Sequence, residues 1–255
     1  MKKKIFIILF FSLFLFSVKG HTYSSDPKEF ITEIVNEAKK ILVKTNSKDF
    51  KTSKLSEIAK ETVDIEGIGY YSIGEYKKNL SEEQLKEYLI LFEKYFLISF
   101  TSRLADYSDP KIEVVSEKVI NNKYTIVESI LIATDKKPEV KISWRVYTKN
   151  PDQPMIRDLI IEGLSLARTQ KEEFASVIEN NNGDINQLFA ALRIIDQELV
   201  KSDNFNGSWG GAIGMTQMIP TTFLDSAYDW DGNGIDIWNS YLDAFASTAN
   251  YLTSI

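Results

Sequence analysis

The chain of 255 residues contains no cysteine, a single histidine and no apolar run long enough to cross a membrane. Without cysteine no disulfide can form, so a hydrophobic core must hold the fold together unaided. The longest apolar run, Ile5 to Val18, has fourteen residues. As a helix it would measure about 21 Å, whereas the hydrocarbon core of a bilayer is about 30 Å thick. The sequence thus excludes a disulfide scaffold and favours a cleaved leader over a membrane span.

The flanks of that run support the same interpretation. Lys2, Lys3 and Lys4 precede it, and Lys19 and Gly20 follow it. A basic start, a short apolar stretch and small residues are typical of a secretory signal peptide, here residues 1–20, cleaved after Gly20. The alternative is an uncleaved anchor. Because no cysteine is present to carry a lipid, we expect a soluble periplasmic protein that starts at His21. We expect His21 to lie in a mobile terminus and not to act as a metal ligand or a base.

The charge balance excludes a class of partners. The formal net charge is −6, and cleavage of the leader with its four lysines makes it −10. An acidic chain without a basic cluster argues against nucleic acid as a ligand. It argues equally against simple electrostatic adhesion to anionic lipid.

Lysine and arginine are absent from the last 54 residues, since all thirty lie at or before Lys201. The same tail holds half of the glycines and three of the four tryptophans, Trp209, Trp230 and Trp238. This shift predicts two units, residues 21–192 and residues 193–255, with the seam between Ala190 and Asp196. The alternative is one domain with an acidic, aromatic end.

The first unit opens with helices. Asp26 is a candidate N-cap, and Pro27 falls in the first turn of a helix that extends to about residue 43. A second helix, residues 81–107, begins with Ser81 and Gln84 at the spacing of a capping box. Apolar residues lie on more than one side of this second helix, which indicates burial between layers or the wall of an apolar space.

From residue 111 the apolar pattern changes to a period of two. Four segments, 111–120, 123–134, 139–148 and 155–166, are predicted strands of an antiparallel meander with turns between them. Residues 169–193 return to a helical pattern, with a break near Asn182 and Gly183. Helices, an antiparallel sheet and further helices make an α+β fold, followed by a small, mainly helical tail.

The segments YKKNLSEEQLKEYLILFEKYF, WRVYTKNPDQPMIRDLIIEGLSL and DLIIEGLSLARTQKEEFASVIENNNGDINQLFAAL stand in a characteristic order. By this ordered set, residues 27–193 resemble the MlaC, or toluene-tolerance, family of periplasmic phospholipid carriers. The resemblance implies a carrier, linked to an ABC transporter, that shuttles phospholipid between inner- and outer-membrane complexes. It implies no catalytic residue and no required cofactor.

Such a carrier needs an apolar cavity. Two acyl chains contain roughly thirty methylenes at about 0.8 kcal/mol each, so roughly 24 kcal/mol opposes their exposure to water. The resemblance makes the surplus apolar residues between helix and sheet the candidate walls, although each could simply pack the core. These are Tyr70, Leu89, Phe92, Phe96, Phe100, Ile130, Ile142, Trp144 and Val146. Arg103 and Lys141 are candidates for contact with a head group, or else are solvated charges.

The tail contains FNGSWGGAIGMTQMIPTTFLDSAYDWDGNGIDIWNSYLDAFASTANYL. This segment resembles the core of the MltB-type lytic transglycosylases, which cleave the glycan of peptidoglycan. The resemblance places Ser208, Gln217 and Tyr251 on positions that contact the glycan. Peptidoglycan is therefore a candidate partner of the tail.

A possible calcium loop lies within the tail. Asp229, Asp231 and Asn233 alternate like the first ligands of an EF-hand, with Gly234 at the turn and the carbonyl of Ile235 next. Ser240, at the twelfth position, cannot supply the usual bidentate carboxylate. The resemblance implies a longer loop closed by Asp243; without it, an Asp- and Gly-rich turn is the simpler interpretation.

The catalytic glutamate of the transglycosylases has no counterpart. In that family the glutamate is the first residue of a five-residue motif. It is followed by Ser or Thr, then any residue, then an aromatic residue and then Gly. This motif occurs nowhere in the chain. Glu198 and Glu162 lie in other patterns, and the chain stops at Ile255, before the family's C-terminal part. We therefore expect a phospholipid carrier with a truncated transglycosylase-like segment. The alternatives are a lytic transglycosylase with an unusual N-terminal domain, or a carrier with a non-catalytic glycan-binding tail.

Overall fold

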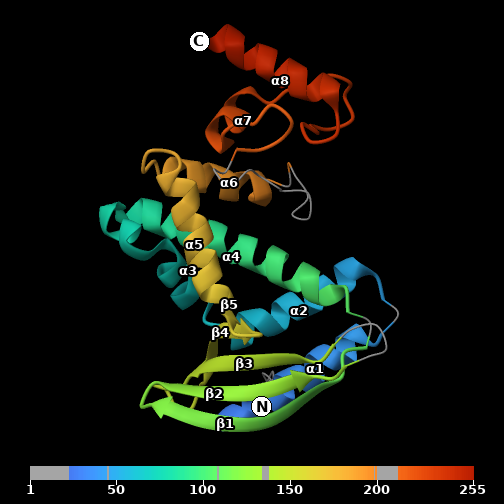
Figure 1. Cartoon of the computed structure of the whole chain (residues 1–255), viewed down its shortest axis with the longest axis vertical. Coiled ribbons are helices and arrows are strands. Elements are labelled where there is room, and N and C mark those ends of the chain that lie inside the picture. The colour runs from blue at the N-terminus through green and yellow to red at the C-terminus, as the bar shows by residue number, and fades with distance from the viewer. Residues whose placement is uncertain (1–22, 45, 108, 134–137, 198, 200–211) are drawn as a thin grey trace, which may run out of the picture.

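The structure is a computed structural model that describes residues 23–44, 46–107, 109–133, 138–197, 199 and 212–255. A sheet and helix α1 form one end, α2 to α5 form a middle layer, and α6 to α8 lie toward the other end (Figure 1). The helices are α1 (Pro27–Leu42), α2 (Lys48–Thr62), α3 (Ile65–Ile73), the 3₁₀ helix η1 (Gly74–Asn79), α4 (Glu82–Ala105), α5 (Leu166–Glu179), α6 (Asn186–Asp196), α7 (Pro220–Ser226) and α8 (Tyr241–Ser254). In the part of the chain thus described, no helix combines the length and apolarity needed to cross a bilayer. The predicted signal peptide and His21 lie outside these residues.

Both predicted helix starts are confirmed. The Asp26 carboxylate accepts the backbone N–H of Glu29 at 2.9 Å and caps α1. In α4, the Ser81 hydroxyl accepts the N–H of Gln84, whose side chain accepts the N–H of Ser81. These caps satisfy backbone donors that have no partner within the first turn of a helix.

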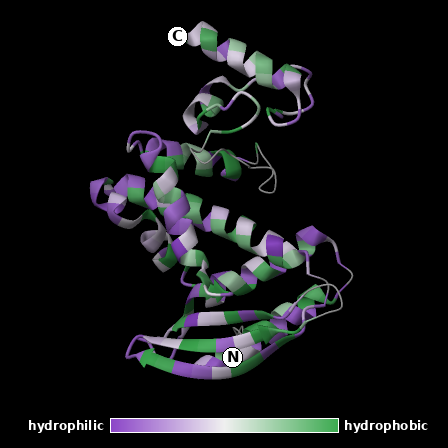
Figure 2. Ribbon diagram, in the orientation of Figure 1, coloured by the Kyte–Doolittle hydropathy of each residue, from purple (hydrophilic) through white to green (hydrophobic). Residues whose placement is uncertain are grey.

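The sheet is an antiparallel meander in the order β1-β2-β3-β4-β5. Its strands are β1 (Ile112–Asn121), β2 (Tyr124–Leu131), β3 (Val140–Tyr147), β4 (Met155–Ile161) and β5 (Leu164–Ser165). The colours that alternate along the strands reflect one covered and one wetter face (Figure 2). The prediction of four strands missed β5, because Glu162 and Gly163, both with positive φ, turn the chain back at once. Two consecutive left-handed residues are the geometry of a tight hairpin.

The core of the first unit lies between α4 and its neighbours. Tyr88 and Phe92 of α4 are fully buried, and Phe174 of α5 packs edge-on against Phe92 with 6.1 Å between ring centroids. The Tyr88 hydroxyl donates to the Gly69 carbonyl of α3 at 2.9 Å, so its polar end is satisfied. As expected from its apolar residues on several sides, α4 is buried between layers.

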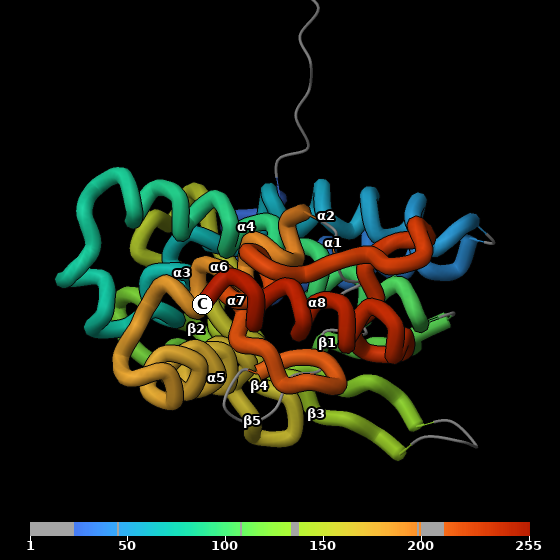
Figure 3. Tube along the Cα trace, turned by 90° about the horizontal axis from the view of Figure 1, so that it is seen from above, coloured from blue at the N-terminus to red at the C-terminus, as the bar shows by residue number. Residues whose placement is uncertain are grey.

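Helix α6 contributes to two cores. Leu188 and Leu192 are buried in the core of the first unit, whereas Ile194, 0% exposed, belongs to the core of the tail. The Gln187 side chain bonds Thr221 of α7, with 2.9 Å between Nε2 and the Thr221 hydroxyl. Viewed from above, α7 and α8 lie over α6 and the middle layer (Figure 3). The predicted seam at 192–193 falls within α6, so the two units are joined by a shared helix.

Candidate functional site

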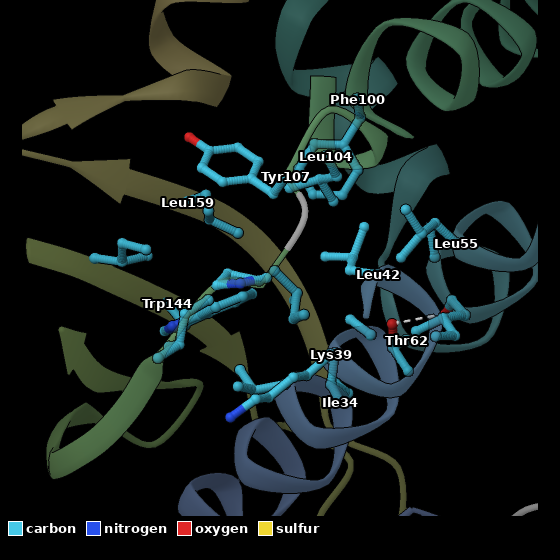
Figure 4. A pocket seen from close by; sticks show the side chains of 18 of the residues that line it. Ile34, Lys39, Leu42, Leu55, Thr62, Phe100, Leu104, Tyr107, Trp144 and Leu159 are labelled. Atoms are coloured by element: carbon cyan, nitrogen blue, oxygen red, sulfur yellow. Dashed lines mark hydrogen bonds between the residues drawn. The ribbon is translucent and has the colours of Figure 1, made fainter. Parts of the chain in front are cut away.

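An apolar cavity of ≈ 160 Å³ lies between α1, α2, the C-terminal end of α4 and the inner face of the sheet. Its walls include Leu42, Leu55, Phe100, Leu104, Trp144 and Leu159 (Figure 4). The amphipathic pattern of α1 and the alternation of the strands direct these side chains inward. Trp144 donates its Nε1–H to the Ser129 hydroxyl at 2.8 Å, so its ring lines the cavity with its polar group satisfied.

A second chamber of ≈ 320 Å³ adjoins the first, between α4, α5 and β4. Leu104, Tyr107 and Leu159 line both chambers, so the two spaces meet at these side chains. The second chamber alone falls within the volume of ordinary small-molecule sites, about 300–1,000 Å³. Two adjoining apolar spaces of this kind favour a ligand with long hydrocarbon chains.

The second chamber has a polar rim. It contains Ser99, Arg103, Thr169, Gln170 and Glu173. The Tyr95 hydroxyl donates to Gln170 Oε1 at 2.6 Å, and Gln170 Nε2 lies 3.4 Å from Glu173 Oε2.

The electrostatics of this rim depend on a carboxylate and a guanidinium. Although the Glu173 side chain is exposed as a whole, enough protein surrounds its carboxyl group for burial to raise its pKa. The positive charge of Arg103 acts in the opposite direction on that pKa. The two groups therefore lie close enough to interact, at the polar edge of an apolar chamber.

The tail brings three carboxylates together. One oxygen from each of Asp229, Asp231 and Asp243 lies within 4.8 Å of the others. Asp229 accepts the backbone N–H groups of Gly234 and Gly232, both at 2.8 Å, and these bonds lower its pKa. Because no lysine or arginine follows Lys201, no basic side chain of the tail itself balances this charge. The donor set suits a hard cation such as Ca²⁺.

Asp243, in the first turn of α8, holds this loop through its buried carboxylate. It is 0% exposed, and its carboxylate accepts the N–H groups of Trp230 at 2.9 Å and Asp236 at 3.0 Å. Ser240, excluded as a ligand on sequence grounds, caps α8 by accepting the Asp243 N–H. Sequence reasoning missed Asp236, whose carboxylate accepts the N–H groups of Trp238 and Asn239 and shapes the loop.

Comparison with known proteins decides the family. Residues 29–194 match the family described as MlaC protein. The chain belongs to the MlaC family. Residues 184–255 match the transglycosylase SLT domain, so the two matches overlap over residues 184–194, which include most of α6. No curated protein matches the chain.

Two solved structures are similar to parts of the chain. The phospholipid-binding protein of Ralstonia solanacearum, solved in complex with a phospholipid, is 18% identical with a TM-score of 0.53. That alignment covers 66% of this chain and 93% of the other, and it shows a shared fold. SltB3 of Pseudomonas aeruginosa, in complex with NAG-anhNAM-pentapeptide, is 52% identical over 28% of this chain and 19% of its own, with a TM-score of 0.27.

The predicted walls of the MlaC domain divide into three groups, which line the chambers, pack in the core or lie elsewhere. Phe100, Ile142 and Trp144 line the first chamber, and Phe96 and Phe100 line the second. Phe92 and Val146, both 0% exposed, are instead packed in the core. Phe92 belongs there because Phe174 of α5 covers its ring.

The remaining predicted wall residues lie elsewhere in the MlaC domain. Ile130 pairs with Lys141, which places both on the sheet face opposite Ile142 and Trp144. Tyr70 and Leu89 line a separate depression between α3 and α4. Lys141 does not line the cavity, and its backbone N–H donates to the Glu162 carboxylate at 2.5 Å. Of the two candidates for a head group, only Arg103 reaches the rim.

Helices α1 and α2 supply walls that the sequence analysis did not assign. Ile34, Ala38 and Leu42 of α1, with Leu55 and Ile58 of α2, line the first chamber. The signal was present in the sequence of α1, where Ile34, Ala38 and Leu42 recur at helical spacing. What was missing was the knowledge that α1 packs against the sheet, where it contacts β1 and β2.

The two predicted glycan contacts that the structure describes, Gln217 and Tyr251, lie in different segments of the tail, before α7 and in α8 respectively. Gln217, at a positive φ of 53°, donates its side-chain N–H to the Gly214 carbonyl at 2.9 Å. Tyr251 lies on α8 and is 37% exposed. Within residues 212–255 no hydrogen bond joins the two. Ser208 and Glu198 lie outside the described residues.

Proposed function

We propose that the protein is a periplasmic phospholipid carrier, which encloses the acyl chains of its ligand and leaves the head group at the polar rim. The observation that carries this proposal is the pair of adjoining apolar chambers inside a fold of the MlaC family. The Ralstonia protein that shares this fold was solved with a phospholipid, which supports the same ligand class here.

The physical requirement is protection of hydrocarbon from water. Transfer of two acyl chains from an apolar environment to water costs roughly 24 kcal/mol of free energy, at about 0.8 kcal/mol per methylene. Trp144, Leu159 and Phe100 offer apolar surface in place of the bilayer. In this proposal the leader is cleaved near Gly20, and the mature protein then carries phospholipid between complexes of the inner and outer membranes.

Purified full-length protein is expected to retain phospholipid. Native mass spectrometry should show a complex with one lipid, and extraction should recover about one mole of lipid phosphorus per mole of protein. Delipidated protein should take up lipid again from vesicles. Protein that stays empty after incubation with vesicles would contradict carriage of phospholipid.

We also propose that the 229–243 loop binds Ca²⁺. Asp229, Asp231 and Asp243 would supply carboxylate oxygens, with Asn233 and the Ile235 carbonyl as further ligands. The support is the clustering of three carboxylates, one of them fully buried, in a segment without a basic residue. A bound cation would offset the mutual repulsion of these carboxylates and hold the loop against α8.

The protein is expected not to cleave peptidoglycan. Cleavage needs an acid that protonates the departing sugar oxygen, a step worth about 10²- to 10⁴-fold in rate. Ser208, Gln217 and Tyr251 are not such acids, and the chain lacks the family's glutamate motif. The measurement is mass spectrometry of purified peptidoglycan after incubation. Release of 1,6-anhydro-muropeptides that disappears in Glu198→Gln would instead favour the lytic transglycosylase.

A further inference from the structure

The polar rim of the second chamber carries one group of each charge on two different helices. Arg103 comes from the last turn of α4, and Glu173 comes from α5. Arg103 makes no ion pair within 4.0 Å among the described residues. Its guanidinium still has donors to offer to a ligand at this rim.

Glu173 is the carboxylate of this rim that is available to a ligand. Among the described residues, its carboxylate accepts one hydrogen bond, the long 3.4 Å contact from Gln170 Nε2. Asp158, the other acid that lines the chamber, is 3% exposed and already accepts from the Ser165 hydroxyl at 2.7 Å and the Ala167 N–H at 3.0 Å. Asp158 therefore anchors the start of α5, whereas Glu173 faces the chamber edge with its acceptor capacity largely unused.

We propose that this rim selects a zwitterionic phospholipid with an ammonium head group, such as an ethanolamine lipid, over an anionic glycerol lipid. The inference rests on the proposed carriage of phospholipid. The Arg103 guanidinium takes the phosphate, which both lipids share, and the Glu173 carboxylate takes the ammonium. A glycerol head group offers Glu173 no cation and leaves the phosphate charge balanced by Arg103 alone.

A second basic side chain, Lys39, also lines the cavity and could bind the head-group phosphate in place of Arg103. Lys39 of α1 lies in the wall of the first chamber (Figure 4), which shares Leu104 and Leu159 with the second. No carboxylate lines that first chamber, so a head group at Lys39 would meet a positive charge only. The paired charges at Arg103 and Glu173 match a zwitterion better than Lys39 does.

The test is lipid uptake by delipidated full-length protein. Vesicles contain equal amounts of phosphatidylethanolamine and phosphatidylglycerol with the same acyl chains, and mass spectrometry measures the lipids that are bound. The wild-type protein should enrich the ethanolamine lipid about two- to fivefold, the range expected of partly exposed ion pairs. Glu173→Gln should abolish this enrichment without loss of total lipid, and Arg103→Gln should lower the uptake of both lipids.

Glu172→Gln provides the matched control. Glu172 is the neighbouring exposed acid on α5, does not line the chamber and carries the same charge. Its substitution should leave the enrichment unchanged. Full uptake without enrichment by the wild-type protein, or enrichment that survives Glu173→Gln, overturns this inference but not carriage itself. Loss of uptake in Lys39→Gln but not in Arg103→Gln also overturns it, whereas absence of all lipid refutes the proposed carriage.

Discussion

Leu159→Glu is expected to reduce bound phospholipid at least about tenfold. Leu159 lies where the two chambers meet, so a carboxylate there would be placed against the acyl chains. The effective cost of taking one ion out of water is several kcal/mol, and each 1.4 kcal/mol changes an equilibrium tenfold. The measurement is lipid phosphorus per mole of purified protein, together with native mass spectrometry.

Ile160→Glu is the matched control for this substitution. Ile160 is the next residue of β4, pairs with Ser143 and lies on the opposite face of the sheet, away from both chambers. It should retain lipid at the wild-type level. Leu159→Trp, which fills the cavity without a charge, should also lower occupancy. Full lipid binding by both folded Leu159 variants would show that the cavity is not the lipid site.

Asp231→Ala is expected to weaken calcium binding by at least about 10- to 100-fold, the loss seen when even an outer-shell partner of a metal is removed. Asp231 is exposed, and among the described residues its carboxylate accepts a single hydrogen bond, 3.3 Å long, from the Asn233 N–H. The substitution therefore removes a ligand with little damage to the fold. Isothermal titration calorimetry measures the affinity, and Trp230 and Trp238 provide a fluorescence signal within the loop region.

Asp225→Ala removes the same charge from the exposed surface of α7, outside the loop, and should bind calcium like the wild-type protein. Calcium at 100 times its dissociation constant should stabilise the wild-type tail by about 2.7 kcal/mol. An equal response of Asp231→Ala and the wild-type protein to calcium, or the absence of any response in a folded wild-type tail, would argue against the site.

Local patterns predicted α1, α4 and the four long strands because interactions between near neighbours in the chain determine them. The capping box of Ser81 and Gln84 begins α4 as expected, and the helix break predicted near Asn182 and Gly183 falls where both residues adopt positive φ. The period of two in residues 139–148 correctly predicted β3, in which Ile142, Trp144 and Val146 are buried. Such signals depend on neighbours a few residues apart, so they can be seen in the sequence.

The assignment of walls was less complete because it depends on partners distant in sequence. Phe92 and Phe96 lie one turn apart on α4. Only the packing of Phe174 onto Phe92 decides that Phe92 fills the core, while Phe96 is left to line the second chamber. Ile130 shows the same limit, since its face follows from its pairing with Lys141 on β3.

The sequence by itself determined the starts of α1 and α4, the meander of four long strands, the last 54 residues without a basic side chain and the candidate ligands at Asp229, Asp231 and Asp243. Tertiary structure alone decided that those carboxylates converge, with Asp243 fully buried. It also decided that α6 serves two cores, with Leu192 facing one and Ile194 the other. The apolar nature of a side chain already indicates in the sequence that it will be buried. Which other side chains it contacts is decided only when elements distant in the sequence pack together.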